Sequence, residues 1–170
     1  MIIQNDKAAL RTLREYLWRG SAAAFIGCGF SRNAVRKDLQ YPLPPLWKGF
    51  GEKFVRLLKG YDDVECSPDV EKEIDKYLEG KNPLVLTQEY ESLMGRTAMV
   101  DVVRKLINDS NLMPHNLHKD LLRLPWSDVF TTNYDTLLER AAEDLRDLNY
   151  HTITLCEQIV GSTHPRIVMQ

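Results

Sequence analysis

The sequence has little cysteine, and its cysteines are not arranged to bind a metal or to form cross-links. Cys28, Cys66 and Cys156 are the only three among 170 residues, and no two of them form a Cys-x-x-Cys pair. An odd number of widely spaced cysteines supports neither a zinc site nor a disulfide framework. We therefore expect no metal.

Long apolar runs and an excess of one charge are also absent. No apolar stretch approaches the roughly 20 residues that a membrane-spanning helix needs. The segment Met1–Asp6 lacks the basic and apolar regions of a signal peptide. With 22 Lys and Arg against 24 Asp and Glu, the net charge of −2 gives no electrostatic footprint for nucleic acid. These absences predict a cytoplasmic protein without direct nucleic-acid or membrane partners.

The composition is that of a folded domain, with 44% hydrophobic and 27% charged residues. Apolar segments predict strands at Ala22–Ile26, Asp128–Thr132, His151–Leu155 and Arg166–Met169. Helical periodicity lies between them, which predicts an α/β fold with a Rossmann-like parallel sheet. The expected helices are 6–18, Trp47–Lys59, Val70–Glu79, Pro83–Met94, Thr97–Ile107, His118–Leu124 and Asp135–Leu145.

Between the first two expected strands the sequence is rich in charged residues and lacks strand signals. We expect a single domain over residues 1–170 that carries a helical insertion over about residues 48–124. This insertion is too long to be the simple crossover of a Rossmann repeat.

A glycine-rich loop follows the first expected strand. Phe25–Arg32 reads Phe-Ile-Gly-Cys-Gly-Phe-Ser-Arg. Glycines let backbone N–H groups approach a phosphate, Ser31 adds a donor, and a helix expected to begin near Arg32 would add its positive end. The same pattern also suits an ordinary turn between a strand and a helix.

A second polar cluster follows the strand at Asp128. Thr131–Asp135 reads Thr-Thr-Asn-Tyr-Asp, and the carboxyl ends of parallel strands are where α/β sheets bind ligands. We expect this cluster and the glycine loop to share one nucleotide site. The alternative is that Thr132 or Asn133 caps the next helix, with Asp135 near its positive end.

Two features of a hydride-transfer dehydrogenase are missing. Asn33 and its neighbours stand where the third glycine of the fingerprint would be, and no acidic residue ends a second strand about twenty residues on. The histidines have neither metal-ligand spacing nor a neighbouring nucleophile, which predicts surface or loop positions for His115, His118, His151 and His164.

Together the two clusters resemble motifs of the sirtuin superfamily. Phe25–Ser31 is similar to its Gly-Ala-Gly-x-Ser loop, with Cys28 in place of alanine, and Thr131–Asp135 is similar to its Thr-Gln-Asn-x-Asp motif. The Thr-Thr-Asn form, the Pro-x-Trp segment within Pro44–Trp47 and the lack of four zinc cysteines resemble a divergent bacterial branch. That branch includes NAD-consuming effector domains of antiphage defence. The resemblance covers residues 20–170.

The resemblance implies an NAD+ glycohydrolase, with NAD as substrate and no metal. The glycine loop would hold the phosphates and the adjacent ribose. Asn133 would contact the nicotinamide ribose and position the attacking water, and Asp135 would hold the nicotinamide end or support the loop. The implied catalytic residues are Asn133 and Asp135, and the implied NAD-binding residues are Gly27, Cys28, Gly29, Phe30, Ser31, Arg32, Thr132 and Asn133.

One part of the family pattern is not found. The second catalytic residue is a histidine in a Leu/Val-His-Gly motif at the end of the next strand, whereas Pro165–Gln170 reaches only the approach to that point, and His164 comes too early. The resemblance therefore implies an N-terminal piece of a longer effector or a shortened gene product, with cleavage expected of a complete domain.

Two other functions remain open from the sequence. One is an NAD-dependent protein deacylase, and the other is a catalytically inactive nucleotide-binding or interaction module. The expected partners are NAD, a defence-system protein or further C-terminal domains, and a second copy of the chain in a homo-oligomer.

Overall fold

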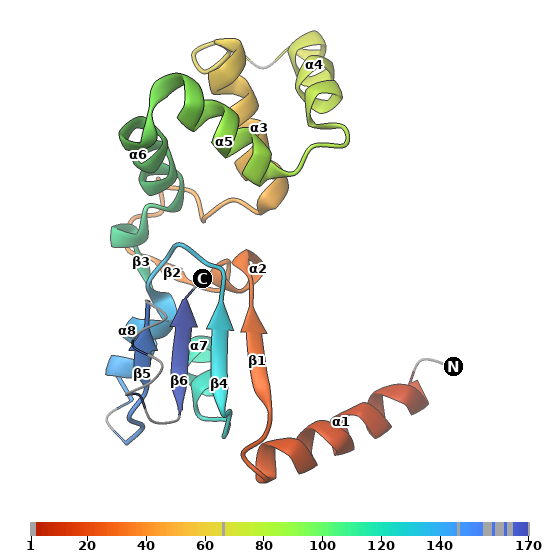
Figure 1. The fold of residues 1–170 in the computed structure, drawn as a ribbon, viewed down its shortest axis with the longest axis vertical. Coiled ribbons are helices and arrows are strands. Elements are labelled where there is room, and N and C mark those ends of the chain that lie inside the picture. The colour runs from red at the N-terminus through yellow and green to blue at the C-terminus, as the bar shows by residue number, and fades with distance from the viewer. Residues whose placement is uncertain are drawn as a thin grey trace. The chain divides into compact units, whose positions relative to one another are not determined.

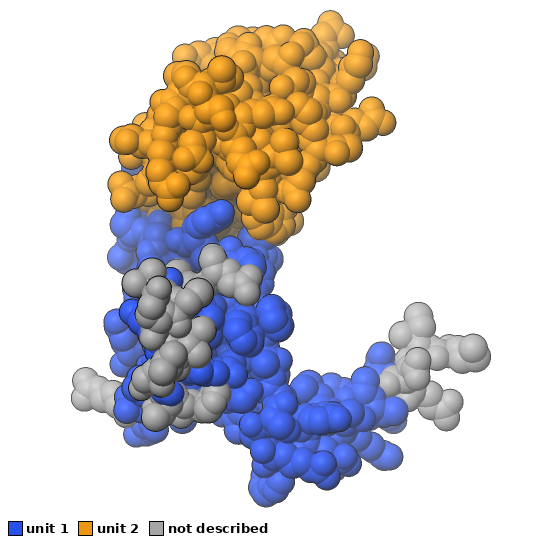
Figure 2. Space-filling model, in the orientation of Figure 1, with its two compact units in different colours: residues 1–42, 109–170 blue, residues 43–108 orange. Residues whose placement is uncertain are grey.

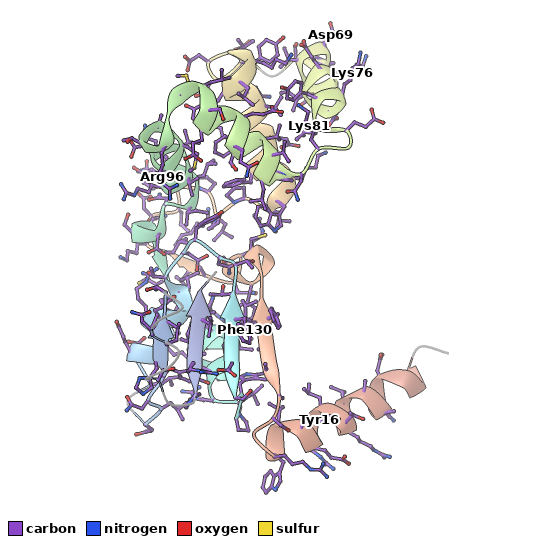
Figure 3. The ribbon with its side chains drawn as sticks, in the orientation of Figure 1. Tyr16, Asp69, Lys76, Lys81, Arg96 and Phe130 are labelled. Carbon is purple, nitrogen blue, oxygen red and sulfur yellow. The ribbon has the colours of Figure 1, made fainter. Side chains whose placement is uncertain are left out.

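A computed structural model describes residues 3–65, 67–145, 147–154, 158, 162 and 165–169 of the chain. It forms two compact units (Figure 2). The sheet unit consists of Met1–Pro42 and Asp109–Gln170, and the helical unit is Leu43–Asn108.

A four-stranded parallel sheet organises the sheet unit (Figure 1). The strand order is β1-β4-β6-β5, and every neighbouring pair is parallel. This confirms the predicted α/β class and parallel sheet, although Leu155 lies outside the described residues. The elements of this unit are α1 (Ile3–Trp18), β1 (Ala23–Ile26), α2 (Cys28–Ser31), β2 (Val35–Arg36), a 3-10 turn (Asp109–Asn111), β3 (Leu112–Met113), α7 (Asn116–Leu122), β4 (Asp128–Thr131), α8 (Leu137–Glu143), β5 (His151–Ile153) and β6 (Arg166–Met169).

One face of the sheet is buried under α7 and α8. Ala24 of β1 is level with Val129 of β4, which is level with Ile167 of β6, so the three side chains share a face. None of the three is more than 7% exposed, and they pack with Leu122 of α7 and Leu138 of α8. Burial of this apolar surface holds the sheet and its two helices together.

A short antiparallel stem closes the sheet unit where the chain leaves it and returns. β2 pairs with β3, and the Asn111 side chain extends the pairing by bonding the backbone of Asp38 twice. Asn111 Oδ1 accepts from the Asp38 N–H at 2.8 Å, and Nδ2 donates to the Asp38 carbonyl at 3.1 Å. The sequence did not predict this stem, because two-residue strands leave no periodicity.

Four helices form the helical unit, and local signals set where they begin. The side chains of Ser67 and Asn82 accept hydrogen bonds from the first turns of two helices, and each is followed by a proline at the first helical position. The predicted bounds Trp47–Lys59 and Pro83–Met94 are confirmed. The helices are α3 (Trp47–Lys59), α4 (Pro68–Leu78), α5 (Pro83–Met94) and α6 (Arg96–Ile107).

The core of the helical unit forms where α3 passes close to α4 and α5. A Cβ added at Gly51 of α3 would lie 3.0 Å from Leu78 Cδ2 and 3.5 Å from Leu86 Cδ1, so the absent side chain permits this approach. Phe54 and Leu86 are fully buried beside it.

The helical unit is shorter than the insertion that the sequence predicts over residues 48–124. Its last residue is Asn108, and α7 belongs to the sheet unit instead. The reason is packing: Leu122 is 1% exposed and lies in the cluster beneath the sheet. The charge and helical periodicity of a segment predict that it is a helix, but they do not predict which hydrophobic core it packs against.

Replacing Leu122 by alanine should lower the free energy of unfolding by about 2–5 kcal/mol, because it leaves a cavity between α7 and the sheet. Leu117→Ala is the matched control on the same helix, since Leu117 is 47% exposed. The control should cost about 0.5 kcal/mol or less. Urea unfolding followed by circular dichroism measures both, and equal losses would contradict the packing of α7 through Leu122.

Candidate functional site

The candidate site lies where β1 and β4 end side by side. Ile26 is level with Thr131 at the carboxyl ends of the two parallel strands. The backbone N–H of Thr132 donates to the Ile26 carbonyl at 3.2 Å, which continues the pairing one residue further. The glycine loop and the Thr131–Asp135 cluster therefore leave the sheet next to each other (Figure 1).

Three buried side chains connect these two segments. Ser31 Oγ donates to Asp135 Oδ2 at 2.5 Å, and Asn133 Nδ2 donates to Ser31 Oγ at 2.9 Å. Ser31, Asn133 and Asp135 are 2%, 8% and 4% exposed. The structure thus joins three of the residues that the sequence singled out, across about a hundred positions of the chain.

Asn133 does not cap the next helix, which was the alternative interpretation. Its backbone N–H donates to Thr131 Oγ1 at 3.1 Å, and its side chain reaches Ser31. The local helix contact is made by Asp135, whose Oδ1 accepts from the Leu137 N–H at 3.2 Å. Asp135 therefore accepts a hydrogen bond from the first turn of α8 with one oxygen and from Ser31 with the other.

The side-chain carbonyl oxygen of Asn133, Oδ1, is buried and has no hydrogen-bond partner among the residues that the structure describes. A buried acceptor without a partner costs free energy that native structures normally avoid. It marks a position where a ligand or a water molecule with a donor group would complete the network.

The glycines of the loop are not required by the fold. A Cβ added at Gly27 or Gly29 would meet no atom within 4 Å, and neither residue has a positive φ. The backbone there is thus open to a bound group.

The helix expected near Arg32 begins earlier: α2 starts at Cys28, and Arg32 follows its last residue. Arg32 therefore does not stand at a helix start, which corrects the expectation.

Three other expected NAD-binding residues, Cys28, Phe30 and Thr132, lie in the same two segments. Cys28 is a half-buried free thiol, and Thr132 is exposed. Phe30 is half-buried, and its ring meets the ring of His118 edge to face, with centroids 4.9 Å apart. Trp47, of the Pro-x-Trp segment, lies in the helical unit.

His118 is a residue that sequence reasoning missed. It was expected at the surface or in a loop, but it is 1% exposed beneath the glycine loop. Its Nδ1 accepts from the His115 N–H at 3.1 Å, whereas its Nε2 has no hydrogen-bond partner in the described part of the chain. Burial lowers the pKa of His118, and the nearby Asp135 carboxylate opposes that shift. The available signal was the His-x-x-His spacing, which here forms a capping box at the start of α7.

Glu139 is a second missed residue. Both of its carboxylate oxygens are buried, and neither has a hydrogen bond to another described residue. Burial raises its pKa, and the carboxylates of Asp135 and Asp109 raise it further, whereas its own backbone N–H and the Arg140 guanidinium oppose the shift. Arg140 itself is held by Asp109, with Nη2 2.7 Å from Oδ1.

Asp109 also fixes the loop after the site. It accepts from the Thr136 N–H at 3.0 Å and from the Thr136 hydroxyl at 2.7 Å. The start of α8 is thereby tied to the segment that returns from the helical unit.

Within the described part of the chain, no group of three or more His, Cys, Asp or Glu residues could hold a metal ion. None of the described helices combines the length and apolar character needed to cross a bilayer. No family model and no curated protein matches the sequence.

Glu139→Gln should stabilise the protein near neutral pH. A raised pKa means that the folded state holds a proton that the unfolded chain has released, so the wild type loses stability as pH rises above about 4.5 and through the folded-state pKa. Glutamine stays neutral, so the gain in Tm should grow from about pH 4 to about pH 8. Glu143→Gln, at the exposed end of the same helix, is the control. A Glu139→Gln gain that does not change with pH contradicts a buried ionisable carboxyl.

Proposed function

We propose that this chain is a sirtuin-like, Rossmann-type NAD-binding domain that cleaves NAD+ at the bond between nicotinamide and ribose. It would act as an NAD+ glycohydrolase in a cytoplasmic effector of prokaryotic antiphage defence, together with a defence-system partner. The resemblance of the glycine loop and Thr131–Asp135 to sirtuin motifs motivates the choice of ligand.

The observation that carries the proposal is the unpartnered carbonyl oxygen of Asn133 beside the open glycine loop. A ribose hydroxyl or a water molecule has the donor that this oxygen lacks. Backbone without Cβ atoms at Gly27 and Gly29 suits the close approach of a pyrophosphate. The two features lie on adjacent strand ends, as one dinucleotide would need.

Cleavage of the bond between nicotinamide and ribose needs few catalytic groups. Nicotinamide leaves as a neutral molecule, so the main tasks are to stabilise positive charge on the ribose and to place a water molecule for attack. An oriented carbonyl oxygen serves both, because its partial negative charge favours the cationic sugar and it accepts a hydrogen bond from water. No metal is required for this cleavage.

Gly29→Ala should separate ligand binding from folding. The new methyl group meets no protein atom within 4 Å and lies in the helical turn α2, so unfolding should be unchanged or up to about 1 kcal/mol more costly. If a pyrophosphate approaches this backbone, the methyl group should weaken NAD binding about tenfold or more, measured by calorimetry. Gly49→Ala, within α3 of the helical unit and at a backbone φ that is not positive, is the comparison that should leave binding unchanged. Wild-type affinity in Gly29→Ala would contradict phosphate binding at this loop.

Asn133→Ala should abolish cleavage. Purified protein is incubated with NAD+, and released nicotinamide is measured by chromatography. Loss of an oriented polar group in the site should lower the rate by about 100-fold or more. An Asn133→Ala protein as fast as the wild type would overturn the hydrolase. A wild type that binds NAD+ but releases no nicotinamide, with or without an acetylated peptide, would instead support the inactive binding module.

A further inference from the structure

We infer that Asp135 acts through Ser31 as a positioning residue, keeping the Asn133 amide turned so that its carbonyl oxygen is left for the ligand. The identity of that ligand rests on the proposed function, whereas the direction of the hydrogen bonds does not. Of these three side chains only that of Asn133 would then touch the ligand, and Ser31 and Asp135 would lie behind it.

The direction follows from counting protons. A carboxylate oxygen can only accept, so the contact of 2.5 Å to Asp135 Oδ2 takes the single proton of the Ser31 hydroxyl. Ser31 can then only accept from Asn133, which must present Nδ2 to it, at 2.9 Å. An amide is ordinarily oriented by the network around it. Here the network allows one orientation, and it places Oδ1 on the other side.

Burial makes this constraint effective. Ser31 and Asp135 are 2% and 4% exposed, so bulk water is not available to replace either bond. The second oxygen of Asp135 is held by the Leu137 N–H at the start of α8, which fixes the carboxylate at one end of the chain of bonds. Rotation of the Asn133 amide would bring two oxygens together without a proton between them.

The neighbouring titratable groups do not supply a competing proton. His118 and Glu139 are the titratable groups whose pKa values respond to Asp135. Within the described residues neither His118 Nε2 nor either carboxylate oxygen of Glu139 makes a hydrogen bond, and His118 Nδ1 accepts from His115, so neither side chain donates to Asp135. Ser31 is accordingly the side chain that donates to Asp135 Oδ2.

This assignment differs from a direct role for all three residues. The Ser31 proton is already used, so the hydroxyl cannot donate to a phosphate oxygen. Asp135 is separated from the ligand position by Ser31. Substitution of either residue should therefore act by turning or freeing Asn133.

The test reverses the direction of the hydrogen bonds that link Asp135, Ser31 and Asn133. In Asp135→Asn the new amide can donate to Ser31, which frees the hydroxyl proton to bond Asn133 Oδ1 and turns the amide over. NAD binding and nicotinamide release should fall as far as in Asn133→Ala. The double variant Asp135→Asn with Asn133→Asp restores a complementary network in the reverse direction, with an oxygen again facing the ligand. It should recover at least about tenfold in affinity over Asp135→Asn alone.

A second measurement needs no ligand. In wild type the side-chain NH2 resonances of Asn133, identified by their loss in Asn133→Ala, should exchange with solvent more slowly than those of the exposed Asn149. Protection should be lost in Asp135→Asn and in Ser31→Ala, and kept in Glu143→Gln. Ser31→Ala removes only one oxygen, so it covers the case in which Asp135→Asn does not fold.

The outcomes separate the two proposals. Unprotected Asn133 amide protons in wild type, or protection unchanged in both Asp135→Asn and Ser31→Ala, would overturn the positioning role. A double variant no better than Asp135→Asn in a protein that binds NAD would also overturn it. The expected protection pattern in a protein that does not bind NAD would support the positioning role and refute the proposed function.

Discussion

The parallel pairing of β1 with β4 is the constraint on which the candidate site depends. Because Ile26 and Thr131 end level with each other, the loops that follow must leave from the same edge of the sheet. That proximity is what allows Ser31 to meet both Asn133 and Asp135. A slip of one residue in this pairing would move Val129 out of the core, so the apolar face and the polar network specify the same register.

The polar groups around this edge are expensive to bury. Hydrogen-bond partners within the described residues are lacking for His118 Nε2, Asn133 Oδ1 and both carboxylate oxygens of Glu139, although the helices that carry or flank them pack tightly. Unsatisfied groups gathered at one place, in a fold whose apolar core is otherwise well packed, are typical of sites that trade stability for function. The surrounding sheet cluster and the clamp of Asp109 on Thr136 offset that cost.

What the sequence could predict was decided by local signals. Proline and glycine fixed the ends of α3 and α5, and apolar runs located β1, β4 and β6. Parallel strand ends also predicted that the glycine loop would lie near Asn133. The direction of the Ser31 bonds and the burial of His118 could not be predicted, because both depend on side chains distant in the sequence. Glu139 looked like an ordinary acidic residue in the first turn of a helix.

The stem formed by β2 and β3 has a consequence for how the chain tolerates change. Asn111 and Asp38 hold the two ends of the helical unit together within the sheet unit. Leu43–Asn108 is therefore a loop whose two ends are closed by the stem. The entropic cost of closing such a loop grows only slowly with the number of residues in it. The length and composition of Leu43–Asn108 could therefore change while the sheet edge that carries Ser31 and Asn133 stayed intact.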